Sequence, residues 1–461
     1  MGTGRNRASA SARRRSRSAP KRPPSRPERP APTARSVALG VVRRVVEEDA
    51  YSNLALSAAL RRSRLGDRDR RLATDLAYGT LRRMIPLDAE IRAMAGRSLR
   101  SIDAPVLAAL RLGAFQLRHT RIPAHAAVGE TVGLAPSHAR GFVNAVLRRI
   151  AEAPEPVIEG DDDDAVSLRT GLSAWAVAEL RRVLPAGEVE PAAAALAEPA
   201  ALCLRVNACR ATVEEVEQEL RAEGLEPVPG RHHPDAIRIR SIDPSALAAF
   251  KKGRVTVQEE ASILVGAALE AEPGERVLDV CAGPGGKAAH LACLVQPGGL
   301  AVAGDVSAVR AALVRSAAER LGVPLLVLTQ DARRPAVATG FDAVLVDAPC
   351  SGIGAARRRP ELLWRPAREE LTRLARRQVE ILCGAAEVVR EGGRLIYSVC
   401  TFPRAETEAA VRAFLAKRED FEPLTLPGPG GREAAHRLWP HREGTDAMFF
   451  AGLRRRNRSS G

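Results

Sequence analysis

The sequence lacks a long apolar run and lacks any closely spaced pair of cysteines. No stretch of the 461 residues approaches the roughly 20 apolar residues of a membrane-spanning helix, and no apolar signal-peptide core lies near the start. The seven cysteines include no Cys-x-x-Cys pair, which argues against a zinc site and against a disulfide framework. We therefore expect a soluble cytoplasmic protein with reduced thiols, no membrane association and no bound metal.

The net charge of +15 is concentrated at the two ends of the chain. Residues 1–35 contain eleven arginines or lysines and one acid, and residues 454–461 contain four arginines, so the body between them is nearly neutral. The first segment has too few apolar residues to form a core, so we predict a disordered basic tail there and a basic C-terminal tail at 454–461. A phosphate-binding arm, a solvated extension and a transit peptide are open interpretations, and the many prolines argue against the last.

Apolar residues recur at helical spacing between residues 36 and 150. In SVALGVVRRVVEED, which begins at Ser36, the valines fall at intervals that place them on one helix face. Further segments of this kind, rich in Ala, Leu and Arg, are 52–63, 68–83, 86–96, 103–117 and 138–150. The pattern predicts an all-α domain over 36–150, whose arginines are either RNA contacts or ordinary solvated positions.

Two further segments separate this domain from the rest of the chain. Residues 151–165 read as an acidic linker, and its four consecutive aspartates do not converge on one ion because consecutive side chains diverge. Residues 166–260 read as a small α+β bridging module. Short strands at 201–207 and 236–242 flank a helix that opens with a capping box of Thr212 and Glu215. No chemistry is visible in this module, so a substrate-positioning role and a structural spacer are equally open.

Strand and helix patterns alternate over residues 261–453. This alternation predicts an α/β domain with a parallel, doubly wound sheet, in which ligands bind at the carboxyl ends of the strands. The predicted strands are 275–280, 300–304, 325–329, 342–346 and 394–399, and helices are expected at 307–321 and 366–390.

A glycine-rich turn, CAGPGGK, follows the first of these strands. It is not a phosphate-binding P-loop or a dinucleotide fingerprint, because Cys281 and Ala288 stand where those motifs need glycine or a hydroxyl residue. Asp305, Asp331 and Asp347 end the second, third and fourth strands. Three carboxylates with few cations nearby favour a ligand that is a nucleoside without phosphates and carries a cationic group. S-adenosylmethionine is such a molecule. Each aspartate is also a candidate cap for the loop that follows it.

Two cysteines follow neighbouring strands of the predicted sheet. Cys350 lies just past the fourth strand and Cys400 just past the fifth, so both thiols are expected in one crevice. A thiolate that adds to carbon 6 of cytosine activates carbon 5 for methylation, and Asp347 is placed to stabilise the charge that develops at ring nitrogen 3. Core packing suffices for Cys203, Cys209, Cys293 and Cys383.

Three stretches resemble signature motifs of the Sun (RsmB) branch of the RNA cytosine methyltransferases. They are VLDVCAGPGGK, DAPCSGIGAARRRPELLWR and YSVCTFPRAETE. The helical domain is similar to the NusB-like domain of that branch, RVNACRAT and GRVTVQEEAS resemble its bridging segments, and TDAMFFAGLRR resembles its final strand. The resemblance implies a NusB-like all-α domain, an RRM-like α+β module and a Rossmann-like methyltransferase domain that uses S-adenosylmethionine.

The resemblance also implies roles for individual residues. Cys400 is the expected nucleophile, Cys350 assists product release and Asp347 takes part in catalysis. The expected cofactor contacts are Cys281, Ala282, Gly283, Pro284, Gly285, Gly286, Lys287, Asp305, Asp331 and Asp347. Two departures stand out: Gly283 replaces a usual alanine, and Val399 and Thr401 flank Cys400 where threonine and serine are usual.

The expected substrate is carbon 5 of a cytosine in RNA, with small-subunit (16S) ribosomal RNA favoured, and we expect the protein to act as a monomer. A transfer RNA cytosine methyltransferase and a non-catalytic RNA-binding or antitermination factor are the alternatives. A DNA cytosine methyltransferase would use Cys350 as the attacker and would need a target-recognition domain, which nothing in the sequence resembles.

Overall fold

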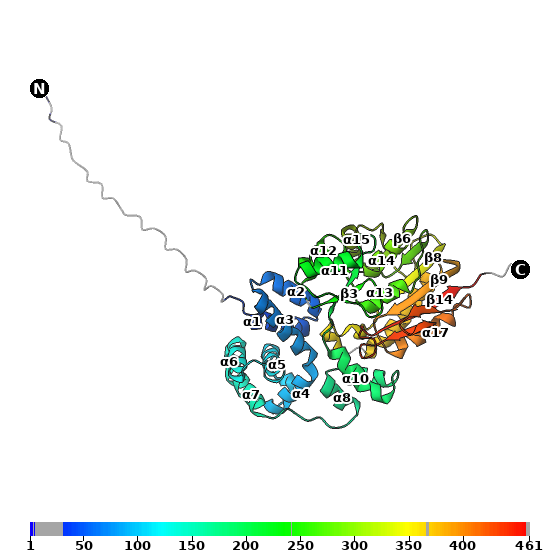
Figure 1. The fold of residues 1–461 in the computed structure, drawn as a ribbon. Helices are drawn as coiled ribbons and strands as arrows, with labels where there is room; N and C mark the ends of the chain where they lie inside the picture. Colours follow the sequence, from blue (N-terminus) through cyan, green and yellow to red (C-terminus); the bar gives the residue numbers. More distant parts are fainter. Residues whose placement is uncertain (3, 5–30, 241, 366–367, 458–461) are drawn as a thin grey trace.

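The computed structural model describes residues 1–2, 4, 31–240, 242–365 and 368–457 (Figure 1). Most of the predicted N-terminal tail and half of the predicted C-terminal tail lie outside these ranges. Within them, no helix is both long enough and apolar enough to cross a lipid bilayer.

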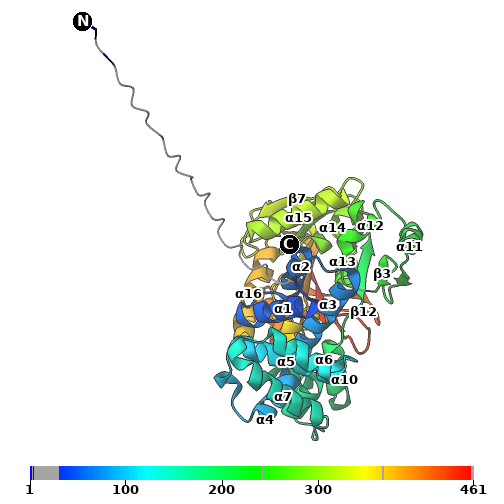
Figure 2. The same ribbon diagram turned by 90° about the vertical axis from the view of Figure 1, so that its left-hand side faces the viewer.

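A helical domain opens the described chain (Figures 1 and 2). Its centre is α5, in which every residue from Val106 to Gln116 is buried. Gly79 lets α3 and α5 approach closely, because a Cβ there would lie 1.9 Å from the Phe115 ring. The helices are α1 (Ala34–Glu47), α2 (Ser52–Arg62), α3 (Asp67–Arg82), α4 (Met84–Ala95), α5 (Ala104–His119), α6 (Ala124–Leu134) and α7 (Arg140–Glu152).

Three short helices follow this domain and pack against the C-terminal part of the protein. They are α8 (Asp163–Thr170), α9 (Ala174–Arg181) and α10 (Ala186–Ala197). Their buried residues share one core with Phe402 and Trp439. Within the aspartate run, Asp162 caps α8, since its Oδ1 accepts a hydrogen bond from Ala165 N at 2.8 Å.

The α+β module has a four-stranded antiparallel sheet in the order β2-β3-β1-β4. The predicted capping box is present: Thr212 Oγ1 accepts from Glu215 N, and Glu215 accepts from Thr212 N. The elements are β1 (Leu202–Val206), α11 (Val213–Ala222), β2 (Val228–Pro229), β3 (Ala236–Ile239), α12 (Ala248–Lys251) and β4 (Val255–Val257).

The C-terminal domain is built on an eight-stranded sheet in the order β10-β14-β9-β8-β5-β6-β7, with β13 also paired to β14. Its strands are β5 (Arg276–Asp279), β6 (Leu300–Asp305), β7 (Leu326–Thr329), β8 (Phe341–Asp347), β9 (Val389–Val399), β10 (Phe421–Leu424), β13 (Ala435–Leu438) and β14 (Met448–Arg455). A separate hairpin is formed by β11 (Leu426–Gly428) and β12 (Gly431–Glu433).

The prediction of a parallel sheet is correct from β7 to β9 and wrong beyond β9. The pairs among β5 to β9 are parallel, whereas β14 runs antiparallel to β9, and β10 and β13 run antiparallel to β14. A parallel neighbour needs a crossover connection, usually a helix. The residues between β13 and β14 form none, which fits the antiparallel pairing of these two strands. The sheet is therefore mixed, and the predicted fold class of a helical domain, an α+β module and a Rossmann-like domain is confirmed.

Helices cover both faces of this sheet, as the alternation of side chains along β8 requires. Val344 and Val346 join the core under α16 (Arg368–Ala386) and α17 (Glu408–Leu415). Ala343 and Leu345 join the core under α13 (Glu260–Ala267), α14 (Gly286–Leu294) and α15 (Ala308–Leu321). Loops, rather than helices, follow the carboxyl ends of the parallel strands and form that edge of the sheet.

The stretch after β8 links the two large domains. The indole Nε1 of Trp364 donates to Leu81 O of α3 at 3.0 Å, and Arg82 Nη2 donates to Arg357 O at 2.9 Å. The Arg359 guanidinium lies over the Tyr51 ring, 4.5 Å from its centroid. The helical domain therefore packs against the segment that follows Cys350.

One prediction about the cysteines is wrong. Cys209 and Cys293, expected as reduced core residues, form a disulfide bond. Cys209 follows β1 of the α+β module and Cys293 lies in α14, so the bond joins two elements that are 84 residues apart in sequence. Such a pairing depends on how the module docks against α14, which residue spacing alone does not reveal.

Candidate active site

The parallel strands end at one level, which gathers the predicted site residues at one edge of the sheet. In the pairing register, Asp347 at the end of β8 lies opposite Ser398 of β9. On the other side, Asp279 pairs with Leu345, and Asp305 pairs with Thr329 of β7. The side chains that follow these ends are therefore neighbours in space.

The glycine-rich turn between β5 and α14 is held by buried acids. Asp279 is 1% exposed, and its Oδ1 accepts a hydrogen bond from Cys281 N at 3.1 Å. Burial, followed by the charge of Asp347, raises the pKa of Asp279 to about 7. Burial also raises the pKa of Cys281, so this thiol stays protonated at neutral pH. At the start of α14, Gly285 has a φ of +113°, which L side chains rarely adopt.

Asp305 ties this turn to the second strand. It is 4% exposed, and its carboxylate accepts from Gly283 N at 3.1 Å and from Ser307 N at 2.9 Å. Arg310 lies across the same carboxylate, with Nε 3.1 Å from Asp305 Oδ2, and donates to Gly283 O at 2.6 Å. A Cβ on residue 283 would lie 2.6 Å from Asp305 Oδ2, so this glycine leaves room for the aspartate and the arginine.

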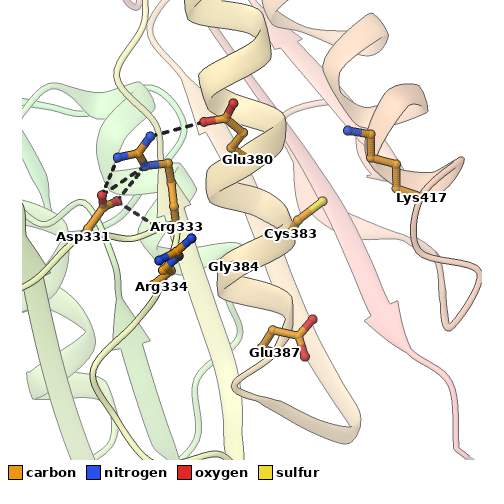
Figure 3. Close-up of a pocket in the computed structure, with 8 residues that line it drawn as sticks. All are labelled: Asp331, Arg333, Arg334, Glu380, Cys383, Gly384, Glu387 and Lys417. Atoms are coloured by element: carbon orange, nitrogen blue, oxygen red, sulfur yellow. Dashed lines mark hydrogen bonds and ion pairs between the residues drawn. The ribbon is translucent and has the colours of Figure 1, made fainter.

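Asp331 is placed differently from the other two predicted carboxylates. Its side chain is 38% exposed and pairs with Arg333, whose hydrogen bonds lower the pKa of Asp331 to about 2. Figure 3 shows this pair beside α16. The Asp331–Arg333 pair borders a surface cavity of about 750 Å³. The cavity is lined by Asp331, Arg333, Arg334, Glu380, Cys383, Gly384, Glu387 and Lys417.

Two thiols meet at the edge between β8 and β9. Cys350 Sγ and Cys400 Sγ are 3.5 Å apart, and both side chains are partly buried. Gly354 N donates to Cys400 O at 3.0 Å, which holds the two cysteine-bearing loops together. The sequence placed both cysteines at this edge, and the structure brings their sulfurs into contact.

The buried Lys287 and the partly exposed Asp347 form an ion pair next to the thiols. Lys287 Nζ donates to Asp347 Oδ2 at 2.9 Å and to Ser262 Oγ at 3.2 Å. Ser398 Oγ donates to the other oxygen of Asp347 at 2.8 Å. Burial lowers the pKa of Lys287, but the charge and hydrogen bond of Asp347 outweigh it, so the pKa is raised and the ammonium persists.

The two thiols have opposite electrostatic surroundings. The hydrogen bond shared with Cys350 is the main factor that lowers the pKa of Cys400. Burial and the charge of Asp347 oppose this shift, and the charges of Lys287 and Arg359 add to it. The same hydrogen bond, followed by burial and the charge of Glu406, raises the pKa of Cys350 well above its usual value. Cys400 is therefore the thiol better suited to ionise, and Cys350 the one suited to remain protonated.

A buried carboxylate that the sequence analysis missed connects the two cysteine loops. Glu406 is fully buried, and its Oε1 accepts from Ser351 N at 2.9 Å and from Gln378 Nε2 at 3.0 Å. Its Oε2 accepts from Ser351 Oγ at 2.6 Å and lies 3.4 Å from Thr401 Oγ1. Glu406 thus bridges the residues that directly follow Cys350 and Cys400.

The only sequence signal for Glu406 was its place in the stretch YSVCTFPRAETE. An acid six residues after a cysteine reads equally as a surface charge. The hydroxyl of Thr401 takes part in this network, so the threonine that replaces the usual serine keeps the hydroxyl on that side of Cys400. Val399, on the other side, is fully buried in the core of the sheet.

Family models cover the three parts of the chain. Residues 266–454 match the model described as 16S rRNA methyltransferase RsmB/F, and residues 32–152 match the NusB family. Residues 172–244 match the ferredoxin-like domain of RsmF/B-like methyltransferases.

Relatives match over nearly the whole length. The chain is 34% identical to ribosomal RNA small subunit methyltransferase B of Pseudomonas putida, with 91% of this chain and 98% of that protein covered. The chain belongs to the RsmB family of ribosomal RNA small subunit methyltransferases. It is also 42% identical to Rv1407 of Mycobacterium tuberculosis, a protein named as a methyltransferase, over 92% of this chain and 96% of that one.

A solved structure agrees with this assignment. The crystal structure of PH0851 superimposes with a TM-score of 0.80 at 28% identity, covering 91% of this chain and 98% of that chain. As a member of the RsmB family, the protein is an RNA methyltransferase that uses S-adenosylmethionine. The chemistry of the site fits this cofactor: Asp305 is a buried carboxylate beside a glycine turn, and the two cations at that turn, Lys287 and Arg310, are paired with Asp347 and Asp305.

Proposed function

We propose that the protein methylates carbon 5 of a cytosine in small-subunit (16S) ribosomal RNA through a covalent bond between Cys400 and carbon 6 of the base. The observation that carries this proposal is the contact between the two thiols, 3.5 Å apart, beside the Lys287–Asp347 pair. A non-catalytic RNA-binding protein has no use for two thiols with opposed acidities at the mouth of a cofactor site. As its substrate is ribosomal RNA, we place the reaction in the cytoplasm.

The first step belongs to Cys400. Its thiolate, favoured by the Cys350 hydrogen bond and by the Lys287 charge, forms the bond to carbon 6. The electron pair of the 5,6 double bond then moves toward ring nitrogen 3 and leaves carbon 5 nucleophilic. The target base must lie outside any stack for the sulfur to reach it.

Asp347 and Lys287 are proposed to handle the charge at ring nitrogen 3. One oxygen of the Asp347 carboxylate accepts a hydrogen bond from Ser398 and the other accepts one from Lys287. A proton held between Asp347 and Lys287 can therefore neutralise the negative charge that develops at ring nitrogen 3. S-adenosylmethionine supplies the methyl group for carbon 5. Residues 281–287, Asp305 and Asp331 are proposed to hold it.

Cys350 is proposed to assist release. After methylation, the proton on carbon 5 must leave to a base, the double bond re-forms and the bond from Cys400 to carbon 6 breaks. Cys350 touches the departing sulfur, and its S–H is proposed to donate a hydrogen bond that stabilises Cys400 as a thiolate leaving group. Without that thiol, the covalent complex is expected to persist.

Covalent trapping tests this assignment. The full-length protein and its Cys350→Ala, Cys400→Ala and Cys383→Ala variants are incubated with methyl-labelled S-adenosylmethionine and an unmodified small-subunit RNA transcript, then resolved under denaturing conditions. Cys383 lies on α16 and lines the cavity beside Asp331 rather than the edge where the two thiols meet, so its variant is the control for thiol loss.

We expect Cys350→Ala to accumulate a labelled protein–RNA adduct, Cys400→Ala to form none, and the control to turn over like the wild type. Accumulation in Cys400→Ala instead would assign the attack to Cys350. Label transferred to transfer RNA but not to the ribosomal transcript would overturn the proposed substrate.

A further inference from the structure

A second cluster of ligand-type side chains lies outside the active site, at the joint between the α+β module and α14. It consists of His233 and Asp235, in the turn between β2 and β3, and His290 in α14. One ring nitrogen of each histidine and one carboxylate oxygen of Asp235 lie within 4.8 Å of one another. We propose that these three residues bind a divalent transition metal, zinc foremost. The metal would link the α+β module to α14, the helix that follows the glycine-rich turn.

The spacing suits a metal after a small contraction. Three atoms within 4.8 Å of one another share a point about 2.8 Å or less from each of them. Zinc bonds to imidazole nitrogen and carboxylate oxygen measure about 2.0–2.2 Å, so each ligand must move by less than about 1 Å. Two histidines and one carboxylate leave a fourth position for water, a donor set that zinc accepts readily.

The hydrogen bonds of the two histidines leave a ring nitrogen on each of them for a metal. His290 is 3% exposed, and its Nδ1 has no hydrogen-bond partner among the described residues. His233 Nδ1 accepts from Asp235 N at 3.2 Å, which leaves Nε2 for a ligand.

The charges around the cluster are close to balance. Arg205 is buried and repels a cation, but its guanidinium is directed at Gln258 Oε1, 2.8 Å away, and at Gly286 O, 3.4 Å away. Glu260 is 3% exposed and lies beside the cluster, since its Oε1 accepts from His233 N at 3.2 Å. Together with Asp235 it supplies two negative charges, against one from Arg205 and two from the metal.

The location gives the metal a structural role. His290 lies one turn into the helix that begins at Gly286, directly after the glycine-rich turn. The same helix carries Cys293, which is bonded to Cys209 of the module. A metal at His290 would hold the start of α14, and with it the cofactor turn, at a second point against the module. The sequence analysis expected no metal because the cysteines form no Cys-x-x-Cys pair. His233, Asp235 and His290 were not considered together there, since they come from segments far apart in the chain.

Metal content and thermal stability of the full-length protein test this inference. Protein purified with a chelator is reloaded with zinc, freed of excess metal, and analysed by elemental mass spectrometry, while melting is followed with and without zinc. The variants are His233→Gln, Asp235→Asn and His290→Gln. The matched control is His232→Gln, which removes the adjacent histidine, whose Nε2 contacts Glu443 O instead.

We expect about one zinc per chain and a higher melting temperature with zinc in the wild type and in His232→Gln. Zinc content and the zinc-induced stabilisation should both be lost in His233→Gln and Asp235→Asn, which change partly exposed residues and should still fold. Equal zinc in the wild type and in His233→Gln would mean that the thiols or the surface hold the metal, and would overturn the proposal. So would a wild type that retains no zinc after reloading.

Discussion

Glu406 offers a prediction at the scale of one residue. Replacing it with glutamine keeps the shape but removes the charge and sets an amide N–H₂ against donors such as Ser351 N. An unmatched buried polar group costs about 1–3 kcal/mol, and here it would loosen the two cysteine loops relative to each other. We expect Glu406→Gln to lower kcat by about ten-fold or more, with the KM for S-adenosylmethionine nearly unchanged.

Steady-state methyl transfer together with adduct trapping checks this positioning role. The control is Glu387→Gln, which removes an exposed acid that lies just past the end of α16 and pairs with Arg418. A variant that loses cofactor affinity and kcat together would indicate general unfolding of the site rather than displacement of the thiols.

Asp279 predicts how stability changes with pH. Its pKa rises from 3.8 to about 7 on folding because it is buried near Asp347. The protonated form is therefore the one that folding favours. This contribution to stability is fully present below the unfolded pKa and is lost as pH rises through about 7.

We expect the contribution of Asp279 to the unfolding free energy to fall between about pH 4 and about pH 7, by on the order of a few kcal/mol. Asp279→Asn should show a shallower decline in urea denaturation over this range, because asparagine does not titrate. It can still accept the hydrogen bond from Cys281 N, so the turn is expected to form. Parallel curves for the two proteins would rule out the raised pKa.

The sequence was sufficient to predict that the two thiols lie together. It was not sufficient to predict the buried carboxylate of Glu406 that holds their loops. Cys350 and Cys400 were placed together because neighbouring strands of one sheet end together, and their sulfurs are in contact. Their separate roles stay predictions. Glu406 escaped notice because burial, which distinguishes it from a surface acid, depends on side chains such as Gln378 that come from another element.

At the scale of elements, Gly354 marks a place where backbone segments meet. A Cβ there would lie 2.0 Å from Ala447 O and 2.9 Å from Cys400 O. Gly354→Ala must therefore displace the loop that faces Cys400, and overpacking of this kind costs about 1–3 kcal/mol. We expect a lower melting temperature and slower methyl transfer.

A matched control for this change is Gly187→Ala in α10, where nothing lies within 4 Å of the added Cβ. That substitution should leave activity unchanged and stabilise the protein by up to about 1 kcal/mol, since alanine favours helix. Equal melting temperatures for the two variants would contradict the close contact at Gly354.

Element prediction from sequence succeeded where a periodic apolar pattern marks one buried face. The five predicted strands of the catalytic domain each match a strand, from β5 to β9. The missed helices are α6, α8 to α10, α12, α13 and α17. In α6, AHAAVGETVGL interrupts its few apolar residues with glycine, and the alanines of α10 give no contrast between faces. Their helical state depends on packing against other parts of the protein.

The disulfide yields a prediction for the whole molecule. Thiol titration of the unreduced protein in denaturant should find five free cysteines, and reduction should raise this to seven. A bond that closes a loop of 84 residues is worth up to about 4 kcal/mol, so Cys209→Ser should unfold at lower denaturant concentration under oxidising conditions. Seven free thiols without reductant would show that the bond does not form.

The seating of the helical domain has a consequence for the size of the substrate. The chain that leaves β8 passes Cys350 and then supplies Trp364, which hydrogen-bonds to Leu81 of the helical domain. This short segment therefore sets the distance between the thiols and the helical domain. An RNA that contacts both must span that distance, so its shape is selected before its base sequence.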